Sequence, residues 1–386
     1  MTAVMTNMQT EIFISIISDF LNSKASKRNV NIDWSEMLKI AKLHEATGIV
    51  HYQCKEFIPI EFKNQFDQSI ASTIYFYTNR VKEEQTLLRE LRDAGINCII
   101  IKGSAVAAYY PVPSLRTMGD TDVVVDNAEI AHRVLIDAGY ICKTKYAAYY
   151  KRDLLFEIHD QIAHETAVNS REVCDFFNDY KRYIKGDELD WSFHLLFLIF
   201  HMRTHFFGSG IGIRQFMDIA TVTKNNKDLD WSWIETELKE LDLWSFSQKV
   251  FDLNHRWFGI DSPLPINPVD EDFYKEATVE LCLGGVFGHM ENNARKVAVN
   301  GKNHPKLTML MRAWKMVFVP YHNMILMPQY SFLIGKPYLL PVAWIYRGWL
   351  TIKKGGIKKT TQRISSNFVS QNEIEGQKEY INKWTR

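Results

Sequence analysis

The chain has 386 residues, with 46 Lys and Arg against 45 Asp and Glu and a formal net charge of +1. Its apolar share of 46% and charged share of 24% are those of a soluble globular protein, which excludes a collagen-like, a wholly disordered or a disulfide-scaffold chain. The near-zero charge argues against a whole-protein electrostatic footprint for nucleic acid, although it leaves room for a local basic patch.

Cysteine use and the N-terminus favour a cytoplasmic protein. The five cysteines are scattered, odd in number and without CxxC spacing, which is typical of reduced, buried thiols. The N-terminal stretch MTAVMTNMQTEIF lacks the basic start and the long apolar core of a signal peptide. The strongest apolar run, residues 193–202, is about half of the roughly 20 residues that a spanning helix needs, so we expect no transmembrane segment.

Helical periodicity predicts a helical region over residues 10 to about 94. Its last helix carries a leucine stripe and stops at Gly95. The next run, residues 96–101, is short, apolar and β-branched, which predicts a buried strand. A short helix over residues 104–110 follows and is ended by Pro111.

A strand over residues 120–125 and a helix over 128–138 come next. Residues 140–152 and 154–163 then predict an antiparallel strand pair, which completes a compact α/β unit. Helical periodicity returns from residue 187 to 352, and the last 30 residues are polar and are expected to be loosely held. The sequence therefore predicts an α+β protein with four regions: a helical region (1–94), an α/β core (95–165), a second helical region (166–352) and a polar basic tail (353–386).

Two motifs of the α/β unit carry groups suited to anions and metals. Lys102-Gly103-Ser104 lies at the end of a predicted strand, where a glycine lets a phosphate approach the backbone closely. On the strand that starts at Asp120, the two-residue period places Asp120 and Asp122 on one face, and a divalent cation such as Mg²⁺ relieves their mutual repulsion. The alternatives are an ordinary turn for the first motif and a solvated strand edge for the second.

A third motif lies in the sequence LLFEIH. Alternation places Glu157 and His159 on one face of the strand and Phe156 and Ile158 on the other. A third carboxylate that meets the first two would complete a two-metal site, in which one ion activates the attacking oxygen and the other holds the triphosphate. The alternative is an exposed outer strand face.

Taken together, the three motifs resemble the nucleotidyltransferase superfamily of DNA polymerase β-like proteins. The pattern reads IIIKGSAVAAYY, then GDTDVVV, then LLFEIH. The stretch YYPVPSLRTMGDTDVVV is similar to a bacterial family of uncharacterised nucleotidyltransferases. The resemblance implies an α+β fold in which a mixed β-sheet core with two packed helices is flanked by N-terminal and C-terminal helical regions.

The resemblance also implies a role for each motif. Gly103 and Ser104 would bind the nucleotide triphosphate. The catalytic residues, which would also hold Mg²⁺ or Mn²⁺, are Asp120, Asp122 and Glu157, with the role of Glu157 open between metal ligand and general base. Two departures from the superfamily pattern stand out. The 15 residues between Ser104 and Asp120 form a longer spacing than usual, and the third acid is Glu rather than Asp.

Residues around these motifs have two interpretations each. Lys102 either neutralises phosphate charge or is a solvated strand-end lysine, and Arg116 has the bidentate fork that clamps a triphosphate. The possible substrate contacts are His159, His201, Arg214 and Asp218. Their alternatives are packing for the histidines and an internal i,i+4 pair for Arg214 with Asp218. From Arg347 to Arg363 there are six basic residues and no acidic ones, which suits a solvated tail or a surface for RNA, an acidic partner or a membrane.

These expectations describe a Mg²⁺-dependent nucleotidyltransferase. It would transfer a nucleoside monophosphate from an NTP to an unknown acceptor, a small molecule or a protein, with release of pyrophosphate. A first alternative is an RNA-directed nucleotidyltransferase that uses residues 347–363 as an electrostatic arm, so nucleic acid is a possible but not favoured partner. A second is a non-catalytic nucleotide-binding module of the same fold.

Overall fold

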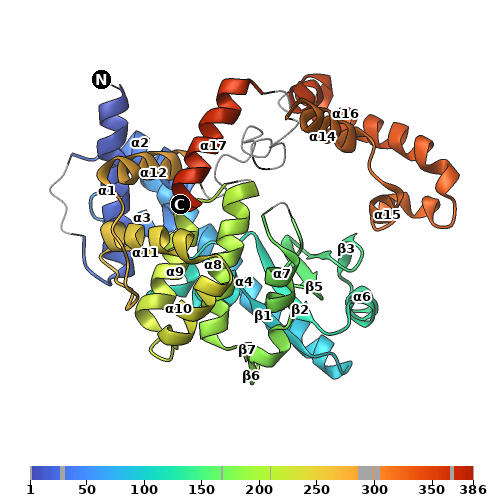
Figure 1. Ribbon diagram of the computed structural model, residues 1–386, viewed down its shortest axis with the longest axis horizontal. Coiled ribbons are helices and arrows are strands. Elements are labelled where there is room, and N and C mark those ends of the chain that lie inside the picture. The colour runs from blue at the N-terminus through green and yellow to red at the C-terminus, as the bar shows by residue number, and fades with distance from the viewer. Residues whose placement is uncertain are drawn as a thin grey trace.

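A five-stranded mixed β-sheet with the strand order β1-β2-β5-β4-β3 organises the fold (Figure 1). The computed structural model describes residues 2–26, 31–166, 168–208, 210–285, 299, 305–365 and 369–385. The strands are β1 (Cys98–Ile101), β2 (Asp120–Val125), β3 (Ile141–Thr144), β4 (Ala148–Lys151) and β5 (Leu154–His159). Strand β2 runs parallel to β5 and antiparallel to β1, and β4 lies antiparallel to both β5 and β3. The expected α+β class with a mixed sheet is confirmed.

The strand expected over residues 140–152 is instead the hairpin β3–β4. The chain turns at Tyr146, which has a φ of +64°, and the N–H of Ala147 donates to the carbonyl of Thr144 at 3.1 Å. The backbone N–H of Tyr146 donates to the hydroxyl oxygen of the buried Tyr149 at 3.0 Å. Because that contact comes from a core tyrosine rather than from Gly or Asn, the turn carries no ordinary sequence signal.

Each face of the sheet has its own helical cover. On one face, Val123 and Phe156 pack with helices α4 (Ile60–Asp93) and α6 (Ala128–Asp137). On the other face, Val124 belongs to the main core of the molecule. Because strand side chains alternate, the acidic residues of β2 and β5 lie on the main-core side of the sheet.

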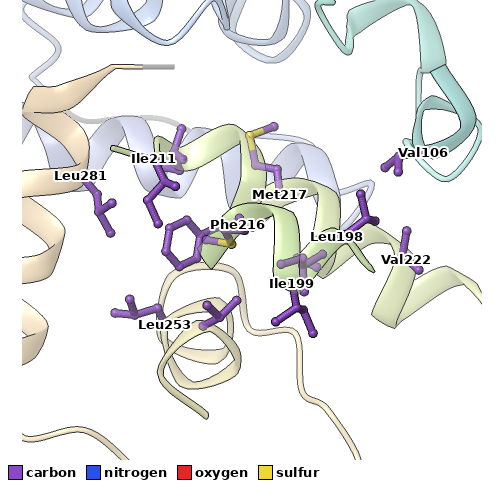
Figure 2. Packing of buried hydrophobic residues seen from close by; sticks show 14 of the residues in the cluster. Val106, Leu198, Ile199, Ile211, Phe216, Met217, Val222, Leu253 and Leu281 are labelled. Atoms are coloured by element: carbon purple, nitrogen blue, oxygen red, sulfur yellow. The ribbon is translucent and has the colours of Figure 1, made fainter. Parts of the chain in front are cut away.

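The main core joins helices from both ends of the chain. The remaining helices of this body are α1 (Thr2–Leu21), α2 (Trp34–Leu43), α3 (Thr47–Cys54), α5 (Gly103–Ala107), α7 (Arg171–Asn178), α8 (Trp191–Gly208), α9 (Ile213–Asn225), α10 (Trp231–Glu240), α11 (Trp244–Phe258) and α12 (Glu271–Gly284), with a small sheet of β6 (Ile184–Lys185) and β7 (Glu188–Leu189). Helix α8 has buried residues on nearly all sides, which suits a helix at the centre of a core. Figure 2 shows Phe216 and Met217 of α9 among Ile199 of α8 and Leu253 of α11.

The C-terminal part of the chain forms an arm and a returning helix. The arm, residues 305–365, contains α14 (Pro305–Val317), α15 (Tyr321–Met324) and α16 (Leu340–Ser365) and stands out from the body in orange in Figure 1. Its own small core consists of Met324, Tyr330, Leu333 and Ala343. Within the described ranges, no helix combines the length and the apolar content that crossing a bilayer takes.

The expectation that the last 30 residues are loosely held is wrong for helix α17 (Gln371–Thr385). Trp384 is fully buried, and its ring contacts Phe206, Phe216, Phe246 and Phe273 of the main core. A few apolar residues are enough to dock a polar helix when one of them is a tryptophan, because that side chain buries a large apolar area. The side chains of residues 354–363, which hold four of the six basic residues counted from Arg347 to Arg363, lie outside the described part.

Candidate active site

A cavity of about 360 Å³ between the sheet and helices α8 and α9 gathers most of the residues singled out by the sequence. Its lining includes Lys102, Gly103, Arg116, Asp120, Asp122, Glu157, His201, Arg214 and Asp218. Two residues of the expected set do not line it. His159 contacts Asp122 instead, and the hydroxyl of Ser104 is directed toward helix α4.

Three acidic residues meet where β2 and β5 run side by side. Asp120 and Asp122 follow the two-residue period on β2, and the parallel register sets Asp122 opposite Glu157. Asp122, Glu157 and His159 each offer a ligand atom, and these atoms all lie within 4.8 Å of one another. Carboxylate oxygens are the donors that Mg²⁺ and Mn²⁺ prefer, so the residues present fit a divalent cation.

Asp122 carries a full negative charge in a buried position. The Lys102 ammonium donates to its Oδ1 at 2.6 Å, and Nε2 of His159 lies 2.9 Å from the same oxygen. Burial by itself raises the pKa of the Asp122 carboxyl, but the Lys102 charge and the His159 contact outweigh it and hold the pKa well below its usual range. The charge of Asp122, a candidate metal ligand, is therefore neutralised in this structure by the Lys102 ammonium.

Glu157 is shifted in the opposite direction. Burial raises the pKa of its carboxyl, and the negative charges of Asp120 and Asp122 raise it further. Its side chain is also more exposed than that of Asp122, at 38% against 8%. A carboxylate with a raised pKa that faces a cavity is suited to accept a proton near neutral pH.

Lys102 is held by its backbone as well as by its side chain. It has a φ of +56° and a ψ of −128°, a conformation that lysine rarely adopts. Its backbone N–H donates to Nε2 of the buried His194 at 3.0 Å. Burial, followed by the Lys102 charge, lowers the pKa of His194 to about 3, so the imidazole stays neutral and can accept this hydrogen bond. His194 thus fixes the turn that presents the Lys102 ammonium to Asp122.

Gly103 makes room for a buried arginine. A Cβ at this position would lie 2.3 Å from Nη1 of Arg116. The Arg116 guanidinium is held from behind by Asp218, with Nε donating to Oδ1 at 3.0 Å and Nη2 to Oδ2 at 2.7 Å. The hydroxyl of Tyr110 donates to the same Oδ1 at 2.6 Å. Arg116 is therefore oriented toward the Gly103 turn by a bidentate ion pair.

The i,i+4 interpretation pairs Asp218 with Arg214, but the hydrogen-bonded ion pair of Asp218 is the one with Arg116. Asp218 pairs with Arg116, while Nη1 of Arg214 donates to Glu45 Oε2 at 3.1 Å and to the carbonyl of Thr117 at 3.2 Å. Arg214 of α9 thus lines the same cavity and contacts the loop before β2 through the carbonyl of Thr117.

Two histidines of α8 close the opposite wall. Nε2 of His201 and Nε2 of His205 lie 3.1 Å apart, and both residues line the cavity. Burial, followed by the Lys102 charge, lowers the pKa of both imidazoles. Among the described residues, the metal-competent group is that of Asp122, Glu157 and His159, and this pair of histidines is not part of it.

Sequence reasoning missed the contribution of helix α4. Oε1 of Glu84 accepts hydrogen bonds from Ser104 Oγ at 2.5 Å and from Thr121 Oγ1 at 2.6 Å. Nη1 of Arg80 donates to Thr121 Oγ1 at 2.8 Å. The available signal was the spacing, because Arg80 and Glu84 continue the helical stripe on which Leu87 is buried. Charged residues on an apolar stripe indicate buried polar partners elsewhere in the fold.

The mixed sheet and the convergence of acidic residues beside a Gly-Ser turn agree with the class that the family comparison gives, a nucleotidyltransferase enzyme. A family model described as "Uncharacterised nucleotidyltransferase" matches residues 31–259, more than half of the chain. The chain therefore belongs to this family of uncharacterised nucleotidyltransferases. The matched region ends with helix α11. No curated protein and no solved structure matches the chain.

Proposed function

We propose that the protein transfers a nucleoside monophosphate from an NTP to an acceptor hydroxyl in a Mg²⁺-dependent reaction that releases pyrophosphate. The observation that carries this proposal is the convergence of Asp120, Asp122 and Glu157 on one face of β2 and β5, within a cavity that also contains Lys102 and Arg116. Ligand carboxylates and phosphate-neutralising cations then lie in one compartment, as phosphoryl transfer requires.

Asp120 and Asp122 would hold the cation, with Glu157 as the third acidic group. When bound, Mg²⁺ supplies charge neutralisation on the triphosphate and lowers the pKa of the attacking hydroxyl. Glu157 is also suited to take the proton of that hydroxyl, because its pKa is raised. Glu157 would act as a metal ligand or as the general base. The pH dependence of activity in a Glu157→Gln variant distinguishes the two roles.

Lys102, Gly103 and Arg116 would bind the triphosphate. The absence of a side chain at Gly103 lets the Arg116 guanidinium lie against the turn, where it can reach a phosphate. Lys102 would exchange its partner, from Asp122 to a phosphate oxygen, when the nucleotide enters with its cation. Ser104 would contribute mainly through its backbone, since its hydroxyl donates to Glu84.

The acceptor would be a small molecule or a protein side chain. His201, Arg214 and Asp218 lie on the cavity wall formed by α8 and α9, opposite the acidic strands, and this wall is the candidate acceptor side. His159 would position Asp122 rather than contact the acceptor, because its Nε2 is directed at that carboxylate.

The test is titration of the four NTPs, with and without Mg²⁺, against wild type and the isosteric variants Asp120→Asn and Asp122→Asn. We expect Mg²⁺-dependent binding that both variants lose while keeping the wild-type circular dichroism spectrum. Asp153→Asn, which removes an exposed carboxylate from the turn before β5, is the matched control and should bind as wild type. Undiminished binding by both site variants would refute the proposal.

A further inference from the structure

The arm, residues 305–365, presents apolar side chains that nothing in the described structure covers. The exposed apolar residues of α14 include Leu307, Leu310, Met311, Trp314 and Val317, and those of α16 include Val342, Ile345, Trp349 and Ile352. Both sets recur at intervals of three and four, so each helix carries one continuous apolar stripe. Ile345 is 75% exposed and Trp314 is 64% exposed.

These stripes are not the core of the arm. That core is formed by Met324, Tyr330, Leu333 and Ala343, which are buried against one another. Ala343 lies on α16 beside the exposed Val342, so the helix uses one side for its own packing and leaves the other outward. Continuous exposed apolar stripes on a folded protein indicate an interaction surface.

The charge of the arm selects among possible partners. Ten of the chain's 46 Lys and Arg residues lie in residues 305–365, together with none of its 45 Asp and Glu residues. Lys306 and Lys315 are exposed on α14 itself, and Lys336 is exposed in the segment before α16. Lys353 lies over the ring of Trp349, with Nζ 4.9 Å from the ring centre. Basic groups interleaved with Trp, Tyr and aliphatic residues match the interface of an anionic bilayer.

We propose that the arm binds the surface of an anionic lipid membrane, with α14 and α16 lying in the headgroup region. The aliphatic residues would enter the acyl boundary while the lysines pair with lipid phosphates. A second copy of the chain is disfavoured because two arms of the same strong positive charge would repel. RNA is disfavoured because the stripes are mostly aliphatic: besides Trp314 and Trp349 they expose residues such as Leu307 and Ile345, which have no planar face on which a base could stack.

The arm also touches the catalytic sheet. The backbone N–H of Lys145, in the β3–β4 hairpin, donates to the carbonyl of Leu326 at 2.7 Å. That hairpin adds Lys143, Lys145 and Lys151 without an acidic residue from 141 to 152. The basic surface therefore continues from the arm onto the edge of the sheet. No described residue of the arm lines the cavity, so membrane binding is independent of the proposed chemistry.

Vesicle flotation of the full-length protein tests the proposal. We expect wild type to float with vesicles of phosphatidylglycerol and phosphatidylcholine in equal parts, and to bind pure phosphatidylcholine vesicles much more weakly. Ile345→Asn/Trp349→Gln should weaken partitioning at least about tenfold, because both side chains lose their apolar insertion. Lys306→Gln/Lys315→Gln/Lys336→Gln should weaken it by about fivefold per charge at low salt and little at high salt.

Ile60→Asn/Tyr75→Gln is the matched control, because it removes from α4, outside the arm, two apolar residues that are at least as exposed. It should float as wild type, and all variants should keep the wild-type unfolding midpoint. Three outcomes would overturn the proposal. The first is that wild type fails to bind anionic vesicles. The second is that wild type binds no vesicles and is a dimer, which Ile345→Asn/Trp349→Gln converts to a monomer. The third is that wild type binds polyuridylate RNA and not vesicles.

Discussion

Lys102 joins a rarely adopted backbone conformation to a buried ion pair. Its N–H is fixed by His194 and its ammonium by Asp122, so both ends of the residue are determined before any nucleotide enters. A cation that neutralises Asp122 in this way would compete with a divalent ion for the same carboxylate. The balance between the two would then set the affinity of the proposed site for metal.

Lys102→Met should therefore change the response to metal as well as stability. We expect the free energy of unfolding at pH 7 to fall by on the order of 3 kcal/mol, because a buried carboxylate loses its ion-pair partner. Mg²⁺ should recover more stability in the variant than in wild type, where the ion must displace the ammonium. Urea unfolding across a Mg²⁺ series measures both, with the exposed Lys63→Met as control. Equal Mg²⁺ responses would contradict the competition.

Gly103→Ala tests the close approach of Arg116 to the turn. The added methyl would lie 2.3 Å from Nη1, and the guanidinium cannot yield without breaking its two hydrogen bonds to Asp218. We expect a destabilisation of about 1–3 kcal/mol and a loss of NTP affinity beyond what that destabilisation explains. Thermal unfolding and NTP titration give the two values. Gly376→Ala in α17, where a Cβ meets open space, should leave the NTP affinity unchanged and raise stability slightly, because alanine favours the helix more than glycine does.

At the scale of secondary-structure elements, helix α4 acts as a brace for the site. Its Glu84 accepts hydrogen bonds from α5 and β2, and Arg80 donates to the same strand and, at 3.3 Å, to the carbonyl of Met118. One turn of α4 therefore fixes both the Gly-Ser turn and the start of the acidic strand. Burial raises the pKa of Glu84, while the hydrogen bonds and Arg80 oppose that rise.

Glu84→Ala should destabilise the protein by about 2–4 kcal/mol, because it leaves buried donors and the Arg80 charge without their acceptor. Glu84→Gln keeps one oxygen acceptor and should retain a larger part of the stability and of the NTP affinity. Urea unfolding and NTP titration of both variants distinguish a positioning role from simple packing. Equal losses of stability and NTP affinity in Glu84→Gln and Glu84→Ala would contradict a positioning role for the acceptor oxygen of Glu84.

At the scale of the whole molecule, buried neutral histidines make stability depend on pH. Burial lowers the pKa of His44 to about 4 and that of His194 to about 3, from an ordinary 6.5. Because the folded pKa values lie below the unfolded ones, their stabilising effect is present above about pH 6.5 and is lost as the pH falls toward the folded values.

The free energy of unfolding should therefore fall by about 4 kcal/mol between pH 7 and pH 5 from these two groups together. His44→Gln should roughly halve that loss, because a glutamine does not titrate. Urea unfolding at pH 7, 6 and 5 gives the values. A wild-type stability that is flat over this range would show that these imidazoles are protonated in the fold.

The sequence predicts those features of the structure that depend on residues close to one another in the chain, and misses those that depend on distant residues. Strand β2 was predicted with its observed bounds because the run DTDVVV carries local alternation and β-branching. The β3–β4 turn was missed because Tyr149, a core residue, fixes it. The docking of Trp384 was missed because its partners are distant in sequence. The acidic motif was visible as a pattern, but its protein cation and the α4 brace come from tertiary contacts.

The ion pair between Arg116 and Asp218 also has a consequence for the order in which the chain matures. The two residues are 102 positions apart, and the pair lies in the wall of the cavity. Such contacts form late in folding because closing a long loop precedes the gain from the contact. During synthesis, the β-strands can emerge and pair well before helix α9 leaves the ribosome. The acidic face would therefore form before Arg116 is positioned, and the proposed nucleotide site would be complete only once helix α9 has docked.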